Sequence, residues 1–505
     1  MGDVAEQGTV YRLISAVAGR LPGKTALIHD GRSLTYAELK ERIDHTAWNL
    51  HAAGVGYGDR FAVFAESCPD ILISYYAASK IGAVMVPINP NMTAAEVGHA
   101  ATHCEANLLY HDDAVASTAA QALPGTKLRP LADLSKPGHA ADVGEDPRID
   151  ADDDCVIVYT SGSTGTPKAI VLSHRSQTGV LASLAEMWGI TESDTTLVGL
   201  PLGYLYGLST AATTQLACGG TVALMRRFHP GKALEAFVAS RATVYQGVPT
   251  MFSMMLDYAE QQRLDIDLSG VRVLICAGAP LPEELKSRFA TRFGKEIQNY
   301  YALSECTPVF GFYASDPVPP PPGAAGKLAP GSSARILDAD GRECPAGTPG
   351  ELLVRAAATM KRYHKDPDNT RAVLVDGWIR TGDIATKDQN GFYAITGRLK
   401  DIIIRGGANI SPAEVEGVLA RHPAVQEVAV IGMPDRIFGE VPVAFVVSRA
   451  GRTVTVDELV TFAAEVLADF KIPRQMRFVD ELPLGQTGKV DRKALRSRWT
   501  SEAHP

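Results

Sequence analysis

The residues best suited to chemistry lie in a loop of glycines and hydroxyl side chains between two short apolar runs. The run CVIVYT, residues 155–160, predicts a buried strand; SGSTGTPK, residues 161–168, follows it, and the apolar run AIVLSH comes next. Glycines let backbone N–H groups converge, hydroxyls add donors and Lys168 adds a positive charge, which together suit a phosphate group. The composition alone leaves a plain hairpin turn about equally open, because glycine, serine, threonine and proline are all common in turns.

The order of residues in this loop separates it from other nucleotide-binding motifs. Pro167 precedes Lys168, where a Walker A loop needs G-K-[ST], and the chain has no G-x-G-x-x-G after a strand and no G-x-S-x-G elbow. The order T-S-G-S-T-G-T-P-K resembles the phosphate-binding signature of the adenylate-forming superfamily. That superfamily includes acyl-CoA synthetases, firefly luciferases and the adenylation domains of non-ribosomal peptide synthetases.

Further blocks resemble the same superfamily, in its order and over nearly the whole chain. They are KIGAVMVPINP (80–90), YALSE (301–305), WIRTGD (378–383), GRLKD (397–401) and PLGQTGKVDRK (483–493), with Trp378 where the family has tyrosine. The resemblance implies an ATP-dependent acyl-CoA synthetase. Such an enzyme joins a carboxylic acid to AMP with release of pyrophosphate and then transfers the acyl group to coenzyme A.

The resemblance also assigns residues to the first reaction, in which two anions must meet, the acid carboxylate and the α-phosphate of ATP. Lys489 would stabilise the transition state and Glu305 would bind Mg²⁺. Thr164 and Lys168 would act with them. The residues implied to bind ATP or AMP are Thr160, Ser161, Gly162, Ser163, Gly165, Thr166, Gly278, Ala279, Pro280, Asn299, Tyr300, Tyr301, Ala302, Ser304, Asp383 and Arg398. Structural alternatives stay open, since Asp383 also suits a turn and loop lysines such as Lys489 are usually solvated.

The second reaction implies a movement of the C-terminal part of the chain. In the family a small C-terminal domain rotates, and Lys400 occupies the hinge position, at the end of an element. We expect the rotation to remove Lys489 and to bring in the segment RGGANISPAEVE, residues 405–416. Gly406 and Gly407 lack side chains, so the pantetheine arm of coenzyme A could pass close to the backbone. The alternative is a simple loop before a helix that begins near residues 411–412.

The stretch PLGYLYGL, residues 201–208, is the part of the sequence that bears on the choice of substrate acid. Peptide-synthetase domains place an aspartate for the substrate amine where this chain has Tyr204, which disfavours amino acids. Many acyl- and aryl-CoA synthetases read P-[LM]-F-H here, so Gly203 and Tyr204 depart from the pattern. We hypothesise that Gly203 frees volume for a bulky acid and that Tyr204 moves aside; compensating packing is the equal alternative. The other pocket residues implied are Tyr206, Val248, Ala277, Cys306 and Pro308, which favour a hydrophobic acid, alicyclic or aryl.

The elements that position these residues predict an α/β protein. Helix and strand patterns alternate to about residue 310, as in layered α/β structure with mainly parallel strands. Residues 326–397 predict a small β-rich, barrel-like unit, and a compact α+β unit follows. We therefore expect an N-terminal AMP-binding domain of layered α/β sub-domains, residues 1–399, and a small mobile C-terminal domain, residues 400–505, that carries Lys489.

Composition excludes several classes of function. The chain of 505 residues has 49 basic and 57 acidic side chains and a net charge of −8, with no long Lys/Arg run, which argues against a nucleic-acid partner. Its seven cysteines include no C-x-x-C pair, which favours a reducing cytoplasm, and the first residues read as no secretory signal. The apolar stretch 71–88 contains Lys80 and Gly82 and predicts a buried helix and strand rather than a membrane span. The alanine and arginine content is compatible with a bacterial source.

Competing functions remain at the level of sequence. The same motifs would serve a stand-alone adenylating enzyme that loads an acyl-carrier protein, because its phosphopantetheine arm is chemically that of coenzyme A. No motif in the sequence specifically favours a luciferase-like oxygenase. A non-catalytic acyl- or nucleotide-binding relative is disfavoured because Lys489, Glu305 and Lys168 are all present. The expected small-molecule partners are the acid, ATP and coenzyme A, and a homo-oligomer is left open.

Overall fold

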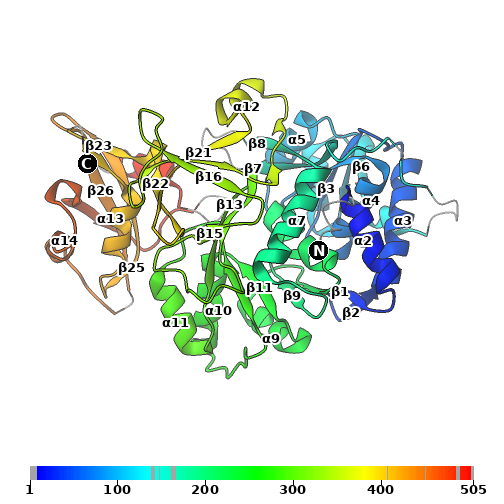
Figure 1. Ribbon diagram of the computed structural model, residues 1–505, viewed down its shortest axis with the longest axis horizontal. Helices are drawn as coiled ribbons and strands as arrows, with labels where there is room; N and C mark the ends of the chain where they lie inside the picture. Colours follow the sequence, from blue (N-terminus) through cyan, green and yellow to red (C-terminus); the bar gives the residue numbers. More distant parts are fainter. Residues whose placement is uncertain are drawn as a thin grey trace. The chain divides into compact units, whose positions relative to one another are not determined.

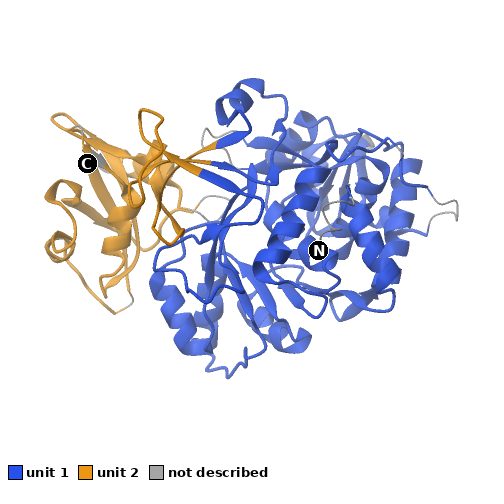
Figure 2. Ribbon diagram, viewed as in Figure 1, with its two compact units in different colours: residues 1–334, 354–379 blue, residues 335–353, 380–505 orange. Residues whose placement is uncertain are grey.

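The computed structural model divides into two compact units (Figures 1 and 2). It describes residues 8–137, 143–146, 148–160, 167–406, 408–449, 451–484 and 490–501. Unit 1 comprises Met1–Ala334 and Val354–Ile379, and unit 2 comprises Arg335–Leu353 and Arg380–Pro505.

A mainly parallel sheet in unit 1 carries the predicted phosphate-binding hairpin. Its strand order is β19-β8-β7-β4-β3-β5-β6. The strands are β3 (Arg60–Phe64), β4 (Val84–Ile88), β5 (Leu108–His111), β6 (Leu128–Pro130), β7 (Asp154–Thr160), β8 (Lys168–Ser173) and β19 (Arg362–Tyr363). β3, β4, β5, β6 and β7 are parallel to one another, whereas β8 runs antiparallel to β7 and β19. Apolar residues along these strands are buried, which explains their continuous runs of β-branched side chains.

A second sheet of unit 1 carries the predicted adenine and acyl sites. Its order is β15-β14-β13-β12-β11-β9-β10-β1-β2, and β18 pairs with β14. The strands are β1 (Thr25–His29), β2 (Arg32–Thr35), β9 (Thr195–Val198), β10 (Thr221–Leu224), β11 (Val244–Gly247), β12 (Val273–Cys276), β13 (Gln298–Leu303), β14 (Cys306–Gly311), β15 (Lys327–Leu328) and β18 (Ala358–Thr359). β14 and β15 pair with each other, so the proline-rich segment 316–323 lies in the connection between two paired strands.

Helices cover these sheets (Figure 1). They are α2 (Val10–Arg20), α3 (Tyr36–Ala52), α4 (Pro69–Ile81), α5 (Ala94–His103), α6 (Ala116–Ala122), α7 (His174–Trp188), the π-helix η4 (Tyr206–Thr213), α8 (Thr214–Ala217), α9 (Pro230–Ser240), α10 (Pro249–Gln261), α11 (Glu283–Phe293) and α12 (Pro367–Val373). Every residue of α4 from 71 to 81 is buried, as expected of a helix that is apolar on all sides. Helix α7 contacts strands of both sheets, β7 and β8 of one and β14 and β18 of the other.

Unit 2 is formed by short strands and a few helices. One sheet, which forms where the chain passes between the units and includes β20 of unit 1, has the order β16-β17-β21-β20, with β22 on β21. The other has the order β24-β23-β26-β25, with β27 on β26. Their strands are β16 (Ser333–Leu337), β17 (Gly350–Arg355), β20 (Leu374–Val375), β21 (Trp378–Lys387), β22 (Tyr393–Arg398), β23 (Ile403–Arg405), β24 (Ala408–Ile410), β25 (Val425–Asp435), β26 (Gly439–Ser448) and β27 (Gln475–Phe478). The helices are α13 (Pro412–Leu419), α14 (Val456–Ala464) and α15 (Arg492–Ser501).

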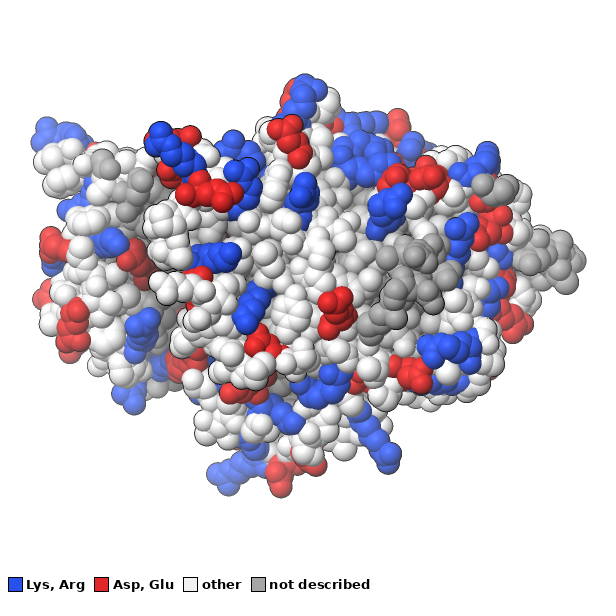
Figure 3. Space-filling view, viewed as in Figure 1, with Lys and Arg blue, Asp and Glu red and all other residues white. Residues whose placement is uncertain are grey.

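The predicted fold class is confirmed: a large layered α/β part precedes a small α+β part. The two compact units divide near residue 380, and unit 2 also includes residues 335–353. The boundary expected at residues 399–400 is a hinge between moving domains, which one arrangement of the chain does not test, so it stays a prediction. Among the described residues, no helix has both the length and the apolar character to cross a membrane. Basic and acidic side chains are interspersed over the face drawn in Figure 3.

Candidate active site

The strands on either side of the glycine-rich loop form a hairpin. β7 and β8 pair antiparallel, and Thr160 lies opposite Lys168. Ser161, Gly162, Ser163, Thr164, Gly165 and Thr166 lie outside the described residues, so their roles stay predictions. The strand pairing is equally compatible with a phosphate-binding loop and with a plain hairpin. The contacts of Lys168 must therefore distinguish the two.

A tyrosine joins the two charged residues that the sequence motifs single out. The ammonium of Lys168 lies 4.7 Å from the centroid of the Tyr363 ring, and the Tyr363 hydroxyl donates a hydrogen bond of 2.8 Å to Oε1 of Glu305. Burial, followed by the nearby Glu305 charge, raises the pKa of the Tyr363 phenol, which keeps it a donor. Lys168 and Glu305 are thus brought together, although 136 other residues lie between them in the chain. The sequence did not point to Tyr363.

A short segment, residues 358–364, places this tyrosine between the two sheets of unit 1. At one end β18 pairs with β14, and the Met360 N–H donates to the carbonyl of Glu305 over 2.8 Å. At the other end β19 pairs with β8, with Tyr363 opposite Ile170. The segment therefore fixes the turn that carries Glu305 to the strand that begins at Lys168.

The predicted adenine residues lie at one edge of the second sheet. β12 lies parallel to both β11 and β13, and Cys276 is opposite Asn299. Residues 277–280 come directly after β12, and Gly278 has φ +84°, a conformation that favours glycine. A Cβ on Gly278 would contact Cγ1 of Val248, which follows β11. Ligands of open α/β sheets bind at this carboxyl edge, so Gly278, Ala279 and Pro280 are suitably placed.

The side chains of β13 divide between its two faces. Asn299 donates from Nδ2 to the Ala324 carbonyl over 3.0 Å, and the Tyr301 ring stacks on Phe310 at 5.5 Å. Tyr300 is buried on the other face, 5.2 Å from Trp188 and 6.3 Å from Tyr206 between ring centroids. Tyr300 therefore groups with a predicted acyl-pocket residue rather than with the adenine residues. Ala302 and Ser304 are partly exposed, and Ser304 and Glu305 form the turn between β13 and β14.

The surroundings of Gly203 favour the packing alternative over the hypothesis that this glycine frees volume for a bulky acid. A Cβ at this position would lie 2.6 Å from Cα and 2.7 Å from N of Asn89, and 2.8 Å from the carbonyl carbon of Ile88. The missing side chain therefore lets the backbone after β4 pass close by. The packing alternative accounts for the glycine.

The remaining acyl-pocket candidates have apolar or neutral surroundings. Tyr204 is partly buried, and burial followed by the charge of Glu96 raises its phenol pKa, so it carries no charge near neutral pH. Tyr206 opens the π-helix η4, a rare form that often marks functional sites, and its hydroxyl donates to the Gly247 carbonyl over 3.4 Å. Burial raises the pKa of Cys306 to about 12, so it stays a thiol. Val248 is partly buried, whereas Ala277 and Pro308 are buried.

Unit 2 pairs two residues that were predicted separately as nucleotide ligands. Asp383 in β21 and Arg398 in β22 are opposite each other, and Arg398 Nε lies 2.7 Å from Asp383 Oδ1. Asp383 is only 1% exposed, whereas the Arg398 side chain is 45% exposed. The arginine thus holds the orientation of a carboxylate suited to accepting hydroxyl hydrogen bonds, as a ribose would require.

The predicted hinge and coenzyme A residues also lie in unit 2. Lys400 is exposed in a 3₁₀ turn, η5 (Leu399–Asp401), directly after β22. Gly406 has φ +57°, and its N–H donates to the Phe438 carbonyl over 2.7 Å. Gly407 and Lys489 lie outside the described residues, so their roles stay predictions.

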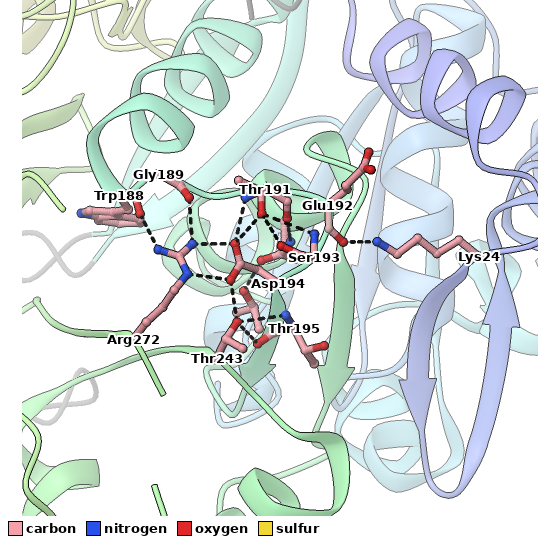
Figure 4. Close-up of polar contacts among 12 residues, drawn as sticks. Lys24, Trp188, Gly189, Thr191, Glu192, Ser193, Asp194, Thr195, Thr243 and Arg272 are labelled. Carbon is pink, nitrogen blue, oxygen red and sulfur yellow. Dashed lines mark hydrogen bonds and ion pairs between the residues drawn. The ribbon is translucent and has the colours of Figure 1, made fainter. Parts of the chain in front are cut away.

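A polar clamp that the sequence did not indicate joins Arg272, Asp194 and Thr243 to the end of α7 (Figure 4). Arg272 donates to both carboxylate oxygens of Asp194, over 2.7 and 2.5 Å, and to the carbonyls of Trp188 and Gly189 at the end of α7. Thr243 donates to the same carboxylate over 2.7 Å. The clamp thus fixes the end of α7, and with it the Trp188 ring that packs on Tyr300.

Comparison with known proteins places this site in a family. The model of the AMP-binding enzymes matches residues 14–364, and the model of the C-terminal domain of AMP-binding enzymes matches residues 414–489. The chain belongs to the AMP-binding enzyme family. Its enzyme class is that of the AMP-forming acid–thiol ligases.

Relatives of this AMP-binding enzyme cover almost its whole length. It is 37% identical over 479 residues to a feruloyl-CoA synthase of an Amycolatopsis species, which covers 95% of this chain and 96% of the relative. It is 33% identical to the fatty acid–[acyl-carrier-protein] ligase ScoC of Streptomyces coeruleorubidus, over 98% of this chain and 97% of that one. The crystal structure of ATP-bound MatB from Rhodopseudomonas palustris superposes with a TM-score of 0.87 at 30% identity, over 98% and 99% of the chains.

Proposed function

We propose that this AMP-binding enzyme converts a hydrophobic aryl acid into its coenzyme A thioester in two steps. In the first, an oxygen of the acid carboxylate attacks the α-phosphorus of ATP, the bond to the β-phosphate breaks, and pyrophosphate leaves. In the second, the sulfur of coenzyme A attacks the acyl carbon, the thiol proton is lost, and AMP leaves. The observation that carries the proposal is the union of Lys168 and Glu305 through Tyr363 beside the glycine-rich loop.

Charge neutralisation is the main contribution of these residues to the first step. Lys168 supplies a fixed positive charge where the loop joins β8. Glu305 offers an oxygen ligand of the kind Mg²⁺ prefers, on a partly exposed turn. Among the described residues no cluster of three or more His, Cys, Asp or Glu side chains could hold a metal, so Glu305 would share Mg²⁺ with the phosphates of ATP. When bound, the cation would neutralise phosphate charge.

Two residues of the C-terminal segment would complete the cycle. By resemblance, Lys489 stabilises the charge that develops as carboxylate and α-phosphate combine. We place the hinge at Lys400, where an exposed turn follows directly on β22. A rotation there would exchange Lys489 for the segment around Gly406, whose backbone a pantetheine arm could approach.

The proposed substrate class rests on the residues around the π-helix η4. Tyr206, Tyr300, Val248 and Ala277 offer rings and alkyl groups, and Tyr204 is a neutral phenol. The relative named feruloyl-CoA synthase acts on an aryl acid. Aryl rings pack well against aromatic side chains, which favours an aryl acid over a small dicarboxylic acid.

The relative ScoC, by its name, transfers acyl groups to a carrier protein, and this supports a second candidate acceptor. The phosphopantetheine of a carrier protein and coenzyme A present the same thiol. We propose coenzyme A as the acceptor and the cytoplasm as the location, since all seven cysteines are free.

Pyrophosphate release across a panel of acids, with and without coenzyme A, tests the proposal. We expect ferulate-like acids to give continuous turnover only with coenzyme A, and Lys489→Ala to lower the rate of the first step about 100-fold or more. Lys493→Ala, in the same segment, is the control. A single burst of pyrophosphate despite coenzyme A would favour a carrier protein. Preference for malonate or acetate would exclude the aryl substrate.

A further inference from the structure

Tyr363 contacts both of the charged residues that the sequence motifs single out. It is 3% exposed, and its ring and its hydroxyl contact different residues, Lys168 by the ring face and Glu305 by the oxygen. A phenol is rigid beyond two torsion angles, so the two contacts are linked geometrically. A shift of Glu305 would pull the ring away from the ammonium.

The backbone around Tyr363 fixes this linkage from both sides. Lys361 donates to the Val171 carbonyl over 2.9 Å and His364 donates to the Ala169 carbonyl over 2.8 Å, so Tyr363 is held against β8 on each side. Glu305 in turn receives the N–H of Met360 on its own carbonyl. The side-chain contacts of Tyr363 therefore lie within a backbone frame that leaves little freedom.

We propose that Tyr363 is a positioning residue for the adenylation step, which holds the Glu305 carboxylate and the Lys168 ammonium at the separation that the magnesium complex of ATP requires. Its hydroxyl donates to Oε1 of Glu305, which would leave the second carboxylate oxygen available to a bound cation. Its ring face seats the ammonium of Lys168 through a cation–π contact. This role rests on the proposed function, and it concerns nucleotide binding rather than the choice of acid.

The two contacts can be separated by substitution. Tyr363→Phe keeps the ring under Lys168 and removes only the hydroxyl, whereas Tyr363→Leu removes both. Tyr313→Phe is the matched control, because the Tyr313 hydroxyl also donates to a partly buried oxygen of unit 1, the Leu328 carbonyl, but has no contact with Lys168 or Glu305 among those described.

The first readout is nucleotide binding in the full chain, measured by calorimetry with α,β-methylene-ATP, with Mg²⁺ and with a chelator. We expect Tyr363→Phe to weaken binding of the magnesium complex about tenfold, the effect of losing a hydrogen bond to a charged group. Binding of the metal-free nucleotide should stay within about twofold, because the ring remains. Tyr363→Leu should also weaken binding of the metal-free nucleotide, by about fivefold, because the ring under Lys168 is lost.

The second readout separates the half-reactions. Tyr363→Phe should slow pyrophosphate release but leave thioester formation from a supplied acyl-adenylate and coenzyme A unchanged, whereas a merely structural role would slow both and lower the melting temperature. In the double variant with Glu305→Gln, the hydroxyl loss should add little.

Equal weakening with and without Mg²⁺ in Tyr363→Phe, or binding equal to that of Tyr313→Phe, would overturn the role of Tyr363 alone. If the wild-type chain bound neither form of the nucleotide, the proposed function would fall together with it.

Discussion

At the scale of single residues, the space around a side chain decides what a substitution can do. Gly203 faces the backbone of residues 88 and 89, and Gly207 approaches the Pro201 carbonyl so closely that a Cβ would lie 2.4 Å from its oxygen. Both glycines permit a dense crossing of backbone segments near η4. Neither provides room for a ligand.

Gly203→Ala should therefore lower stability without changing the choice of acid. The added methyl would meet backbone atoms that cannot rotate away, and overpacking of this kind costs about 1–3 kcal/mol. Urea unfolding measures the cost, and Gly19→Ala, where a Cβ meets nothing within 4 Å in helix α2, is the control. A variant of normal stability that rejects only large acids would revive the volume hypothesis.

Buried histidine gives the chain a pH-dependent stability. His174, the first residue of α7, is fully buried, and burial lowers its pKa from 6.5 to about 4. The unfolded chain therefore binds a proton that the folded chain refuses between these values. The stabilisation is complete above pH 6.5 and is lost as the pH falls toward 4.

We expect His174→Gln to remove about 2 kcal/mol of the loss in unfolding free energy between pH 7.5 and pH 5. Burial also lowers the pKa values of His103 and His364, so part of the wild-type pH dependence should remain. His51→Gln, on the exposed side of α3, controls for loss of an imidazole. An identical pH dependence in His174→Gln and wild type would contradict the assignment.

At the scale of elements, a few polar groups hold the ends of helices to the sheet. The Asp194 carboxylate is 4% exposed in its side chain and receives Arg272, Thr243 and the N–H of Thr191. These bonds fix the C-terminal end of α7, at the point where the helix leaves the space between the two sheets. Burial is the largest single influence on the pKa of Asp194 and acts to raise it, but the hydrogen bonds and the arginine charge together lower the pKa below its usual value.

Asp194→Asn should destabilise unit 1 by about 2–3 kcal/mol, less than a fully buried pair would lose because Arg272 is partly exposed. The fluorescence of Trp188, whose carbonyl belongs to the clamp, would follow the transition. Asp152→Asn removes an ion pair with Arg175 on the surface and should have no measurable effect. Equal stability of both variants would show that the clamp contributes nothing.

Elements with a local cause could be predicted from the sequence. The capping box of Thr455 and Glu458 begins α14, Ser411 precedes α13, and the apolar stretch 71–88 forms α4 and β4. The π-helix η4 and the pairing of residues 358–364 with two sheets could not, because they depend on segments far away in the chain. The sequence motifs identified Lys168 and Glu305, but no pattern in the sequence pointed to Tyr363, which contacts both.

At the scale of the whole molecule, the chain passes between the two compact units more than once. Unit 2 contains residues 335–353 as well as the C-terminal part, and unit 1 takes back residues 354–379 before the chain leaves it again. The residues proposed for the first reaction accordingly come from several separate stretches. The family blocks in the sequence mark these stretches, so candidate site residues could be named from the sequence, whereas the residues that contact them could not.

The strand pairing of β19 with β8 has a consequence for how the protein is made. Arg362 and its ion-pair partner Asp154 are 208 positions apart, and contacts of such long range close late because the intervening chain must be ordered first. During synthesis, the N-terminal segments emerge from the ribosome well before residues 358–364. A nascent chain that lacks these residues also lacks Tyr363, so the contacts that join Lys168 to Glu305 can form only after this segment has been made.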